Sequence, residues 1–263
     1  MDLSGKRVLV TGASRGIGRE IAIQCAGAGA RVALVARNEA AIKELATELG
    51  GTAHPCDLSD AEQVRGLIGR VEADGGPIDV LVNNAGLDAV GALENTSEEV
   101  LAGLLHVNLL TPLELTRQVL PGMVARKAGH LVNVSSYASA AMFPGGTAYA
   151  ASKGGLSHFT EVLRWELEGT GIDLTIVELG PIPTDMLDNV KTYKPTDAGF
   201  GRLYKLGLIV DVPSSTVAAH VVKAISGRKR NVRLPRRGVL FPMLRASSQR
   251  IIRWLCVGIP NRP

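Results

Sequence analysis

The chain contains 263 residues, of which 46% are hydrophobic and 4% aromatic. A chain of this length and apolar content can bury a substantial core, and α/β proteins of this size often form one domain. The scarcity of aromatic residues disfavours a base-stacking platform for nucleic acid. Charged residues interrupt the first apolar run and no stretch of about 20 apolar residues occurs, so neither a signal peptide nor a membrane-spanning helix is expected. The three cysteines and five histidines show no metal-ligand spacing, which predicts reduced thiols in a cytoplasmic protein without a metal.

The net charge of +4 is distributed unevenly along the chain. All 25 Asp and Glu residues lie within residues 1–211, whereas residues 212–263 contain 11 Lys and Arg residues and no acid. The protein is therefore expected to have a mildly acidic body and a strongly basic C-terminal end. Such an end favours an anionic partner, either a membrane surface or a nucleic acid.

Short runs rich in β-branched residues alternate with longer helical segments. Near-continuous apolar runs are typical of strands buried on both faces, and they predict strands at residues 7–11, 31–36, 79–83, 130–135 and 172–179. Helices are predicted at residues 15–29, 38–50, 60–74, 97–127 and 149–169. Asp60 and Ser97 are suited to cap two of them. This alternation predicts an α/β fold, a doubly wound parallel sheet with helices on both faces.

A glycine-rich turn follows the first predicted strand directly, where residues 11–18 read Thr-Gly-Ala-Ser-Arg-Gly-Ile-Gly. Its glycines permit a tight turn and a close approach of the backbone to a pyrophosphate, and the helix that begins there offers free N–H groups and a positive dipole end. The spacing differs from the Gly-x-Gly-x-x-Gly of the broader dinucleotide fingerprint, so a plain strand-to-helix turn remains the alternative. The position of the turn favours the dinucleotide site of a Rossmann fold. The residues expected to bind there are Gly12, Ser14, Arg15, Gly16, Ile17 and Gly18.

The end of the second predicted strand lacks the acid that an NAD site usually places about 20 residues past the glycines. Arg37 stands there instead, and Arg15 lies inside the glycine turn. Two guanidinium groups that converge on one point suit a 2′-phosphate, which arginine binds in a bidentate manner. The alternative is two solvated arginines at helix starts. The sequence therefore favours NADP(H) as the cofactor over NAD.

Further motifs follow in order along the chain: Asp57-Leu58, Asn83-Asn84-Ala85-Gly86, Asn108, Ser135-Ser136 and Tyr149-Ala-Ala-Ser-Lys153. Together with the glycine turn, they resemble the short-chain dehydrogenase/reductase family over residues 5 to about 227. The resemblance implies an oxidoreductase that interconverts a ketone or aldehyde and an alcohol by hydride transfer. It also implies that Asp57 and Leu58 bind the adenine end of the cofactor, that Asn84, Ala85 and Gly86 line the adenine ribose side, and that the protein forms a homodimer or homotetramer.

Tyr149 and Lys153 are four residues apart and so share one face of a helix. A free tyrosine titrates near pH 10, and a nearby ammonium group, helped by an oxidised nicotinamide, is expected to lower that pKa. Tyr149 then acts as general acid or base on the substrate oxygen, and Lys153 also holds the nicotinamide ribose. Taken alone, such a pair is most often a surface pair. By resemblance, Ser136 rather than Ser135 donates a hydrogen bond to the developing alkoxide, and Asn108 binds a water that links Lys153 to solvent.

The chain departs from the family pattern after residues 172–179. Leu179-Gly180-Pro181-Ile182-Pro183-Thr184 stands where the family usually begins with Pro-Gly. Gly180, Ile182 and Thr184 still align with cofactor-binding positions, and by resemblance Thr184 binds the nicotinamide carboxamide. The added proline leaves the path of this loop open.

The substrate is expected to lie over the nicotinamide, between residues 138–143 and the loop after Thr184. Both segments carry mainly apolar side chains, which favours a hydrophobic ketone or alcohol such as a steroid, a retinoid or a lipid. A 3-oxoacyl-thioester reductase is the alternative enzyme, because it has the same catalytic residues. A non-catalytic NADPH-binding regulatory protein is the alternative of another class, and the presence of all four catalytic residues speaks against it.

Residues 1–227 are expected to form the Rossmann domain, and residues 228–263 a last strand and a basic amphipathic extension. If residues 240–257 are helical, a rotation of about 100° per residue gathers apolar side chains in one arc and arginines opposite. This pattern predicts peripheral binding to an anionic membrane on its inner face. The alternative is a helix that packs on the protein and caps the substrate pocket. Nucleic acid is the less favoured partner, because apolar residues are interleaved with the basic ones.

Overall fold

The strands of the computed structural model, which describes residues 1–141 and 143–239, form one sheet in the order β3-β2-β1-β4-β5-β6-β7. Every neighbouring pair in it is parallel. The five strands predicted from the sequence are present at its centre, and β3 and β7 form its two edges. The strands are Arg7–Thr11 (β1), Arg31–Ala36 (β2), Thr52–Pro55 (β3), Val80–Asn83 (β4), Gly129–Ser136 (β5), Ile172–Leu179 (β6) and Asn231–Leu234 (β7).

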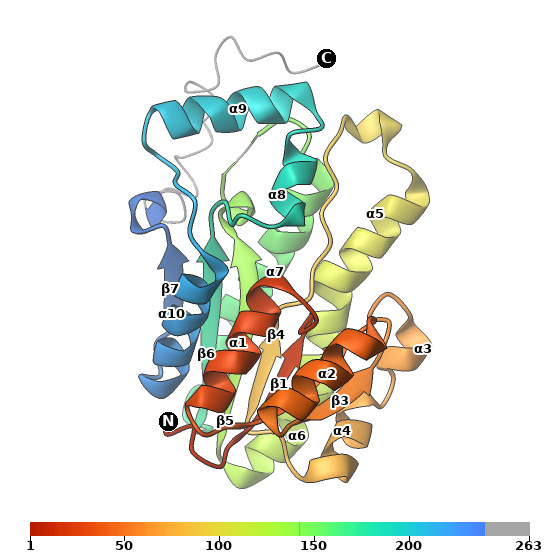
Figure 1. Ribbon diagram of the computed structural model, residues 1–263, viewed down its shortest axis with the longest axis vertical. Coiled ribbons are helices and arrows are strands. Elements are labelled where there is room, and N and C mark those ends of the chain that lie inside the picture. The colour runs from red at the N-terminus through yellow and green to blue at the C-terminus, as the bar shows by residue number, and fades with distance from the viewer. Residues whose placement is uncertain (142, 240–263) are drawn as a thin grey trace.

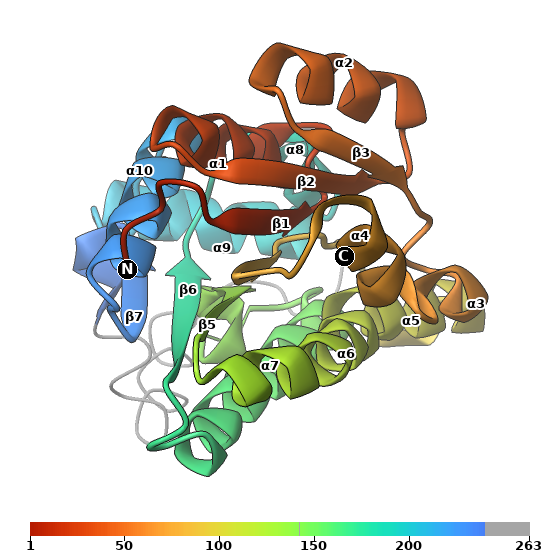
Figure 2. The same cartoon turned by 90° about the horizontal axis from the view of Figure 1, so that it is seen from below.

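Helices cover both faces of this sheet (Figure 1). Figure 2 shows α1, α2 and α10 on one side and α4, α6 and α7 on the other, so the doubly wound Rossmann architecture is confirmed. None of the helices in the described part of the chain is long and apolar enough to cross a membrane. The helices are Gly16–Gly27 (α1), Glu39–Leu49 (α2), Ala61–Val64 (α3), Leu67–Gly75 (α4), Glu98–Leu105 (α5), Thr111–Arg126 (α6), Thr147–Glu166 (α7), Asp185–Val190 (α8), Lys194–Lys205 (α9) and Ser214–Ser226 (α10).

Alternate residues of the central strands face two different apolar layers. Val8 and Val10 of β1 belong to the layer that includes α1 and α10, whereas Leu9 belongs to the layer that includes α4 and α6. All three side chains are fully buried. Because both faces of the strand are covered, consecutive positions must be apolar. This requirement explains the near-continuous apolar runs in the sequence.

The predicted helix at residues 60–74 is in fact two helices. α3 ends at Val64 and α4 begins at Leu67, with Gly66 between them in a left-handed conformation (φ +66°). A residue with positive φ cannot continue a right-handed helix, and glycine adopts that conformation without strain. Asp60 caps α3 as predicted, because its side chain accepts hydrogen bonds from two backbone N–H groups of the first turn.

The predicted helix at residues 97–127 contains a π-helical segment, His106–Leu110, between α5 and α6. Asn108 lies in the middle of this segment. Segments of this kind occur frequently at functional sites because they change the direction in which a side chain points. Ser97 caps α5 as predicted, accepting a hydrogen bond from the backbone N–H of Val100 at 3.3 Å.

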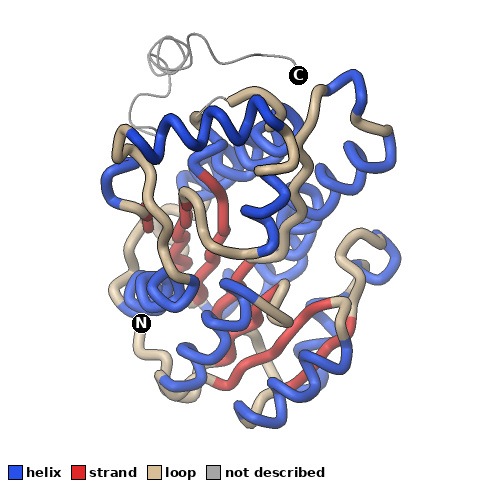
Figure 3. The backbone as a smooth tube through the Cα atoms, turned by 45° about the horizontal axis from the view of Figure 1, so that its top comes forward, coloured by secondary structure: helices blue, strands red, loops and turns tan. Residues whose placement is uncertain are grey.

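The carboxyl ends of the strands form the side of the molecule on which the site lies. The strand order reverses between β1 and β4, and ligands of open α/β sheets bind in the crevice outside the strand ends at such a point. α8 and α9 lie beyond these ends, at the top of Figure 1. Figure 3, in which this end comes forward, shows helices and loops lying across it.

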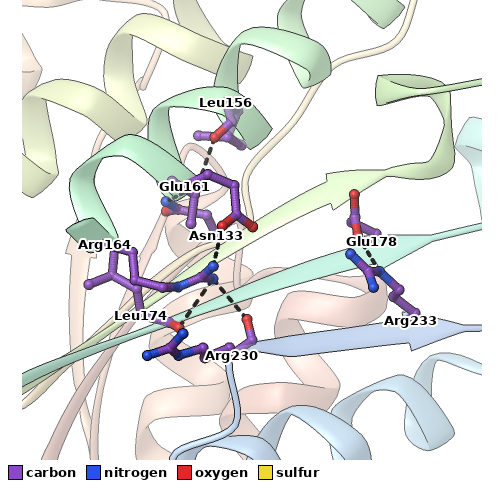
Figure 4. A network of polar contacts seen from close by, with 9 residues as sticks. Asn133, Leu156, Glu161, Arg164, Leu174, Glu178, Arg230 and Arg233 are labelled. Atoms are coloured by element: carbon purple, nitrogen blue, oxygen red, sulfur yellow. Dashed lines mark hydrogen bonds and ion pairs between the residues drawn. The ribbon is translucent and has the colours of Figure 1, made fainter. Parts of the chain in front are cut away.

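Two sets of polar contacts hold the edge strand β7 in place (Figure 4). Arg164 of α7 donates to the carbonyl oxygen of Arg230 at 3.0 Å and is paired with Glu161. Arg233 of β7 donates from Nε to Oε2 of Glu178 in β6 at 2.7 Å, and the Glu178 side chain is only 6% exposed. Glu178 is the penultimate residue of β6, so this ion pair anchors β7 beside the loop that leaves β6.

Candidate active site

The glycine turn joins β1 to α1 at the carboxyl edge of the sheet. Gly12 and Gly16 have φ angles of +66° and +56°, which favour glycine. A Cβ at Gly12 would lie 2.9 Å from Cα of Ala85, and a Cβ at Gly18 would lie 2.3 Å from the carbonyl oxygen of Gly12. α1 has no side-chain cap at its start and no acid in its first turn. Its free N–H groups and its positive dipole end are therefore available to an anionic group.

Thr11 ties the glycine turn to the loop after β4. Its Oγ1 accepts hydrogen bonds from the backbone N–H groups of Asn84 at 3.0 Å and Ala85 at 3.1 Å, and it donates to the carbonyl oxygen of Val82 at 3.2 Å. The Asn84 side chain in turn donates from Nδ2 to the carbonyl oxygen of Thr11 at 3.0 Å. These bonds place the predicted cofactor-binding residues Asn84 and Ala85 directly beside Gly12.

Arg37 and Asp57 lie together where β2 and β3 end. Nη1 of Arg37 is 3.9 Å from Oδ2 of Asp57, and the arginine side chain is 81% exposed. Hydrogen bonds from Ser59, with a smaller contribution from the charge of Arg37, lower the pKa of Asp57. Arg15 is the N-cap residue of α1, and its charge acts on Asp88 of the loop after β4. Arg37 thus has an ion pair with an acid at the end of β3.

The predicted catalytic residues come from different elements and meet at one place. Ser136 ends β5, and Tyr149 and Lys153 lie on α7. Oγ of Ser136 donates to the carbonyl oxygen of Leu179 at 3.3 Å and is close enough to the Tyr149 hydroxyl to lower its pKa. Nζ of Lys153 is 5.9 Å from the centre of the Tyr149 ring and donates to the carbonyl oxygen of Val134 at 3.0 Å. The structure therefore brings together the serine, tyrosine and lysine that the sequence singled out.

Asn108 is fully buried and holds the loop after β4. Its Oδ1 accepts from the N–H of Leu87 at 2.8 Å, and its Nδ2 donates to the carbonyl oxygen of Leu87 at 2.9 Å and to Oγ of Ser152 at 3.1 Å. A Cβ at Gly86 would lie 3.3 Å from Oδ1 of Asn108 and 3.4 Å from Nζ of Lys153. Asn108 and Lys153 thus both lie beside Gly86. That Asn108 binds a water linking Lys153 to solvent stays a prediction.

Burial changes the pKa of both titrating groups of the site. It raises the pKa of Tyr149 to about 12, opposed by the hydrogen bond with Ser136 and assisted by the charge of Asp88. It lowers the pKa of Lys153 to about 8. Desolvation disfavours the charged form of each group. At Tyr149, desolvation is the largest cause and acts in the direction opposite to the lowering that the sequence predicts for a site with an oxidised nicotinamide.

Ser135 takes no part in this arrangement through its side chain. Its Oγ donates to the carbonyl oxygen of Lys153 at 3.1 Å and is hydrogen-bonded with Oγ of Ser157 at 2.8 Å. These buried contacts join β5 to α7. Oγ of Ser136 instead accepts from the N–H of Ala138 at 3.1 Å and lies against Tyr149. The geometry favours Ser136 over Ser135 for the site.

A mainly apolar pocket contains these groups. Ser136, Tyr149 and Lys153 line it together with the loop that leaves β6. In that loop, the N–H of Gly180 donates to the carbonyl oxygen of Leu234 at 2.7 Å, and Thr184 is the N-cap residue of α8. The predicted positions Gly180, Ile182 and Thr184 all line the pocket. Its apolar wall includes Phe143, Met186, Leu187, Val190, Phe200 and Leu203.

The sequence did not single out two polar residues of this pocket, Tyr137 and Asp88. Tyr137 is buried, and its hydroxyl donates to the carbonyl oxygen of Pro235 at 2.8 Å, which ties the end of β5 to the segment after β7. Asp88 stands two residues past the Asn-Asn-Ala-Gly motif, in an otherwise apolar stretch. An acid in such a stretch is a visible signal, but only the fold shows that it enters the pocket.

Known proteins of one family are similar to this chain. The sequence matches the short chain dehydrogenase family over residues 6–194. Ketoacyl reductase HetN of Nostoc sp. is 36% identical over 236 residues, which cover 88% of this chain and 78% of that protein. Dehydrogenase/reductase SDR family member 7B of Mus musculus is 34% identical over 236 residues, covering 86% and 72%. A short chain dehydrogenase of Pseudocercospora fijiensis is 41% identical over 191 residues, covering 70% and 62%.

Solved structures are similar over most of the chain. A short-chain dehydrogenase from Streptomyces avermitilis superposes with a TM-score of 0.81 at 30% identity, covering 97% of each chain. A metagenomic short-chain oxidoreductase in complex with NADP superposes with a TM-score of 0.72 at 31% identity, covering 89% of this chain and 97% of that one. The fold and the site define an oxidoreductase of the Rossmann type. The chain belongs to the short-chain dehydrogenase/reductase family.

Proposed function

We propose that this protein is an NADP(H)-dependent reductase of hydrophobic ketones or aldehydes, with Tyr149 as the general acid. One observation carries the proposal: Ser136, Tyr149 and Lys153 meet in an apolar pocket at the carboxyl end of the sheet. A few convergent polar groups with shifted pKa values in an apolar pocket are typical of an active site. Oxidation of the corresponding alcohol uses the same groups, with the proton moving in the opposite direction.

The residues around the glycine turn suit a dinucleotide. Gly12 and Gly18 leave no room for side chains, and the uncapped start of α1 is available to a pyrophosphate. When bound, the cofactor supplies or accepts the hydride. Arg37 and Arg15 are the proposed ligands of a 2′-phosphate, and the NADP complex of the similar metagenomic oxidoreductase supports this choice. The other proposed contacts are Ser14, Gly16, Ile17, Asp57, Leu58, Asn84, Ala85, Gly86, Tyr149, Lys153, Gly180, Ile182 and Thr184.

Tyr149 holds the proton that reduction of a carbonyl requires. Its pKa of about 12 keeps the hydroxyl protonated at neutral pH. The Ser136 hydroxyl lies near this group in the same pocket and can donate to the substrate oxygen as negative charge develops there. Lys153, with a pKa of about 8, is still mainly cationic at neutral pH and stabilises the tyrosinate that remains after proton transfer. Asn108 keeps the loop beside Lys153 in position.

The pocket wall favours an apolar substrate body, such as a steroid, a retinoid or a lipid chain. A 3-oxoacyl thioester is the second candidate, because the relative named ketoacyl reductase HetN is 36% identical over 88% of this chain. A non-catalytic NADPH-binding regulator is disfavoured, since such a protein has no need to keep a serine, a tyrosine and a lysine together. Among the described residues, no group of three or more His, Cys, Asp or Glu is placed to hold a metal ion.

A panel of substrates tests the proposal. Long-chain ketones and aldehydes, steroid and retinoid carbonyls and a 3-oxoacyl thioester are each incubated with the full chain and NADPH, and the nicotinamide absorbance is followed. Turnover of the apolar carbonyls is the expected result. Turnover of the thioester alone would favour the second candidate, and binding of NADPH without turnover of any compound would favour a regulator.

Self-association through α5, α6 and α7 is also proposed. These helices expose large apolar side chains, and Trp165 is 80% exposed. Burial of apolar surface against a second copy stabilises by about 25 cal/mol per Å². A dimer or tetramer is expected in light scattering at micromolar concentration, and a monomer would contradict the proposal. The exposed large apolar side chains of these helices and of the π-helical segment between α5 and α6 are Val100, Leu110, Val124, Val162 and Trp165.

The C-terminal extension is proposed to bind an anionic membrane surface. The predicted amphipathic helix at residues 240–257 lies outside the described residues. Arg236 and Arg237 are exposed directly after β7, at the pocket end of the sheet, and Nη1 of Arg237 would lie 3.9 Å from a Cβ at Gly207. Residue 237 therefore lies close to the end of α9 and to the pocket. A membrane-bound extension that starts there can deliver a lipid-soluble substrate to the pocket.

A further inference from the structure

Asp88 is an acid in an otherwise mainly apolar pocket. Among the described residues that line this pocket it is the only carboxylic acid. It lies on the loop between β4 and α5, two residues beyond Gly86, which borders Lys153. A carboxylate costs free energy in such surroundings unless a partner compensates it. The position therefore suggests that a ligand uses this group.

The contacts of the Asp88 carboxyl group are incomplete. Its Oδ1 accepts a hydrogen bond from Nδ2 of Asn189 in α8 at 3.3 Å. Its Oδ2 is buried and has no hydrogen-bond partner among the described residues. Most buried polar atoms of folded proteins have such a partner, so an exception needs an explanation. One acceptor site of Asp88 is thus left for a donor that comes from outside the protein.

Asp88 lines the same pocket as Tyr149, the proposed proton donor. Its charge contributes, after burial, to the raised pKa of that tyrosine. Burial raises the pKa of Asp88, opposed by the hydrogen bond with Asn189, by its own backbone N–H and by the charge of Arg15. We have proposed a cofactor phosphate as the partner of Arg15. A substrate that reaches Tyr149 therefore presents its neighbouring atoms to a carboxylate.

We propose that Asp88 is a specificity-determining residue that selects carbonyl substrates carrying a hydrogen-bond donor, a hydroxyl or an ammonium group, on a carbon next to the reacting carbonyl. This inference rests on the proposed function. In the reaction, hydride goes to the carbonyl carbon and the proton of Tyr149 to the carbonyl oxygen, while Asp88 breaks and forms no covalent bond. A 3-oxoacyl thioester presents a second carbonyl acceptor beside the reacting one, and a carboxylate repels it. Asp88 therefore favours an amphiphilic ketone over a thioester.

A matched set of ketones tests this assignment. The set contains a long-chain methyl ketone, the same ketone with a hydroxyl on its methyl carbon, and the same ketone with an ammonium group there. For the natural sequence, kcat/KM is expected to be at least about tenfold higher for the two donor-bearing ketones than for the methyl ketone. A hydrogen bond to a charged acceptor stabilises enough to give a factor of this size. In Asp88→Leu the preference for both is expected to disappear. In Asp88→Asn, which keeps an acceptor but no charge, the hydroxyl preference is expected to persist in part and the ammonium preference to be lost.

A second readout separates binding from turnover. With NADP⁺ in place of NADPH no hydride can move to the carbonyl carbon, so calorimetry measures binding alone for the methyl ketone and the ammonium ketone, neither of which carries an alcohol that NADP⁺ could oxidise. The affinity for the ammonium ketone is expected to fall at least about tenfold in Asp88→Leu, and that for the methyl ketone to change little. Asp188→Leu is the matched control, because this acid of α8 is 73% exposed and paired with Lys191 outside the pocket. Circular dichroism confirms that each variant is folded.

Specific outcomes would overturn the assignment. A kcat/KM ratio near one for the natural sequence, or an unchanged ratio in Asp88→Leu, would mean that Asp88 does not meet the substrate. If Asn189→Leu removes the preference as fully as Asp88→Leu does, Asp88 acts only by holding α8 in place. These results would leave the proposed function standing. Failure of the natural sequence to reduce any ketone would instead overturn the proposed function itself.

Discussion

Nζ of Lys153 lies 5.9 Å from the centre of the Tyr149 ring, one helical turn away on α7. Both side chains are withdrawn from water, and burial shifts their pKa values in opposite directions, to about 12 for the tyrosine and about 8 for the lysine. At neutral pH the tyrosine therefore keeps its proton and the lysine most of its charge. Transfer of the tyrosine proton to a substrate creates an ion pair across this distance, and that attraction favours the transfer.

Replacement of Tyr149 by phenylalanine is expected to abolish most of the activity while the cofactor still binds. The ring continues to fill its place, but the proposed proton donor is gone, so kcat should fall at least about 100-fold. NADPH binding, followed by fluorescence, should change little. Tyr204→Phe is the control, because that hydroxyl is bonded to Asp211 and Tyr204 does not line the pocket. Near-normal turnover in Tyr149→Phe would show that another group supplies the proton.

Lys153 is expected to make the stability of the protein depend on pH. The folded protein loses the lysine proton at about pH 8, whereas the unfolded chain keeps it until about 10.5. Because the unfolded state binds more lysine protons in this window, this one group raises the free energy of unfolding by about 2 kcal/mol between pH 8 and pH 10, while the raised pKa values of the Cys25 and Cys56 thiols act in the opposite sense. Above pH 10 the raised pKa of Tyr149 acts in the opposite sense. Urea unfolding at both pH values measures the slope.

The matched variant for this slope is Lys153→Met, which keeps the length of the side chain and removes its titration. Between pH 8 and pH 10, the change in its free energy of unfolding should be about 2 kcal/mol more negative than the change for the natural sequence, because only the lysine contribution is missing. Lys43→Met, at a side chain that is 63% exposed, should show the same change as the natural sequence. Equal slopes for the natural sequence and Lys153→Met would contradict the lowered lysine pKa.

Arg37 is expected to contribute to the preference for NADPH over NADH. Its guanidinium group is 81% exposed at the end of β2, so it can be replaced without opening the core. Arg37→Ala should weaken NADPH binding at least about tenfold, since a charge-assisted hydrogen bond is lost, and should change NADH binding far less. Arg65→Ala, at a side chain 75% exposed on the segment after α3, is the control. Tighter binding of NADH than NADPH by the natural sequence would disprove the cofactor assignment.

The ion pair between Glu178 and Arg233 is expected to stabilise the edge of the sheet. Glu178→Leu leaves the partly buried guanidinium group of Arg233 without its acid and should lower the free energy of unfolding by about 1–3 kcal/mol. Glu62→Leu removes the partner of Arg65 from a pair in which both side chains are more than 70% exposed, and should cost less than about 1 kcal/mol. Urea denaturation of both variants gives the comparison. Equal losses would mean that burial of the pair adds nothing.

Membrane binding is expected to depend on the residues beyond 239. β7 belongs to the sheet, so a truncation after Gly227 would remove a strand, whereas a truncation after Val239 keeps every strand of the described fold. The full chain should sediment with anionic liposomes at low salt and be released at high salt, because each basic residue near such a surface contributes about 1 kcal/mol. The truncated chain should remain in the supernatant. A full chain that never sediments would favour the pocket-capping alternative.

Local patterns in the sequence determined the architecture and most of the proposed site. The apolar runs at 7–11 and 31–36 predicted buried strands. A strand that is covered on both faces needs an apolar side chain at nearly every position, so its burial is visible in the sequence itself. The glycine turn was visible because only glycine tolerates its positive φ angles and close contacts. The spacing of Tyr149 and Lys153 marked one helix face, which the structure confirms.

The tertiary structure alone decided what depends on contacts between distant segments. The charge of Arg15 acts on Asp88, and Asp88 is bonded to Asn189, which is 101 positions away in the sequence. The pKa of Tyr149 is raised rather than lowered, because desolvation depends on everything packed around the hydroxyl and not on the lysine one turn away. Periodicity and spacing report only on neighbours along the chain. Burial and charge act through space, so the fold was needed to find the acid in the pocket.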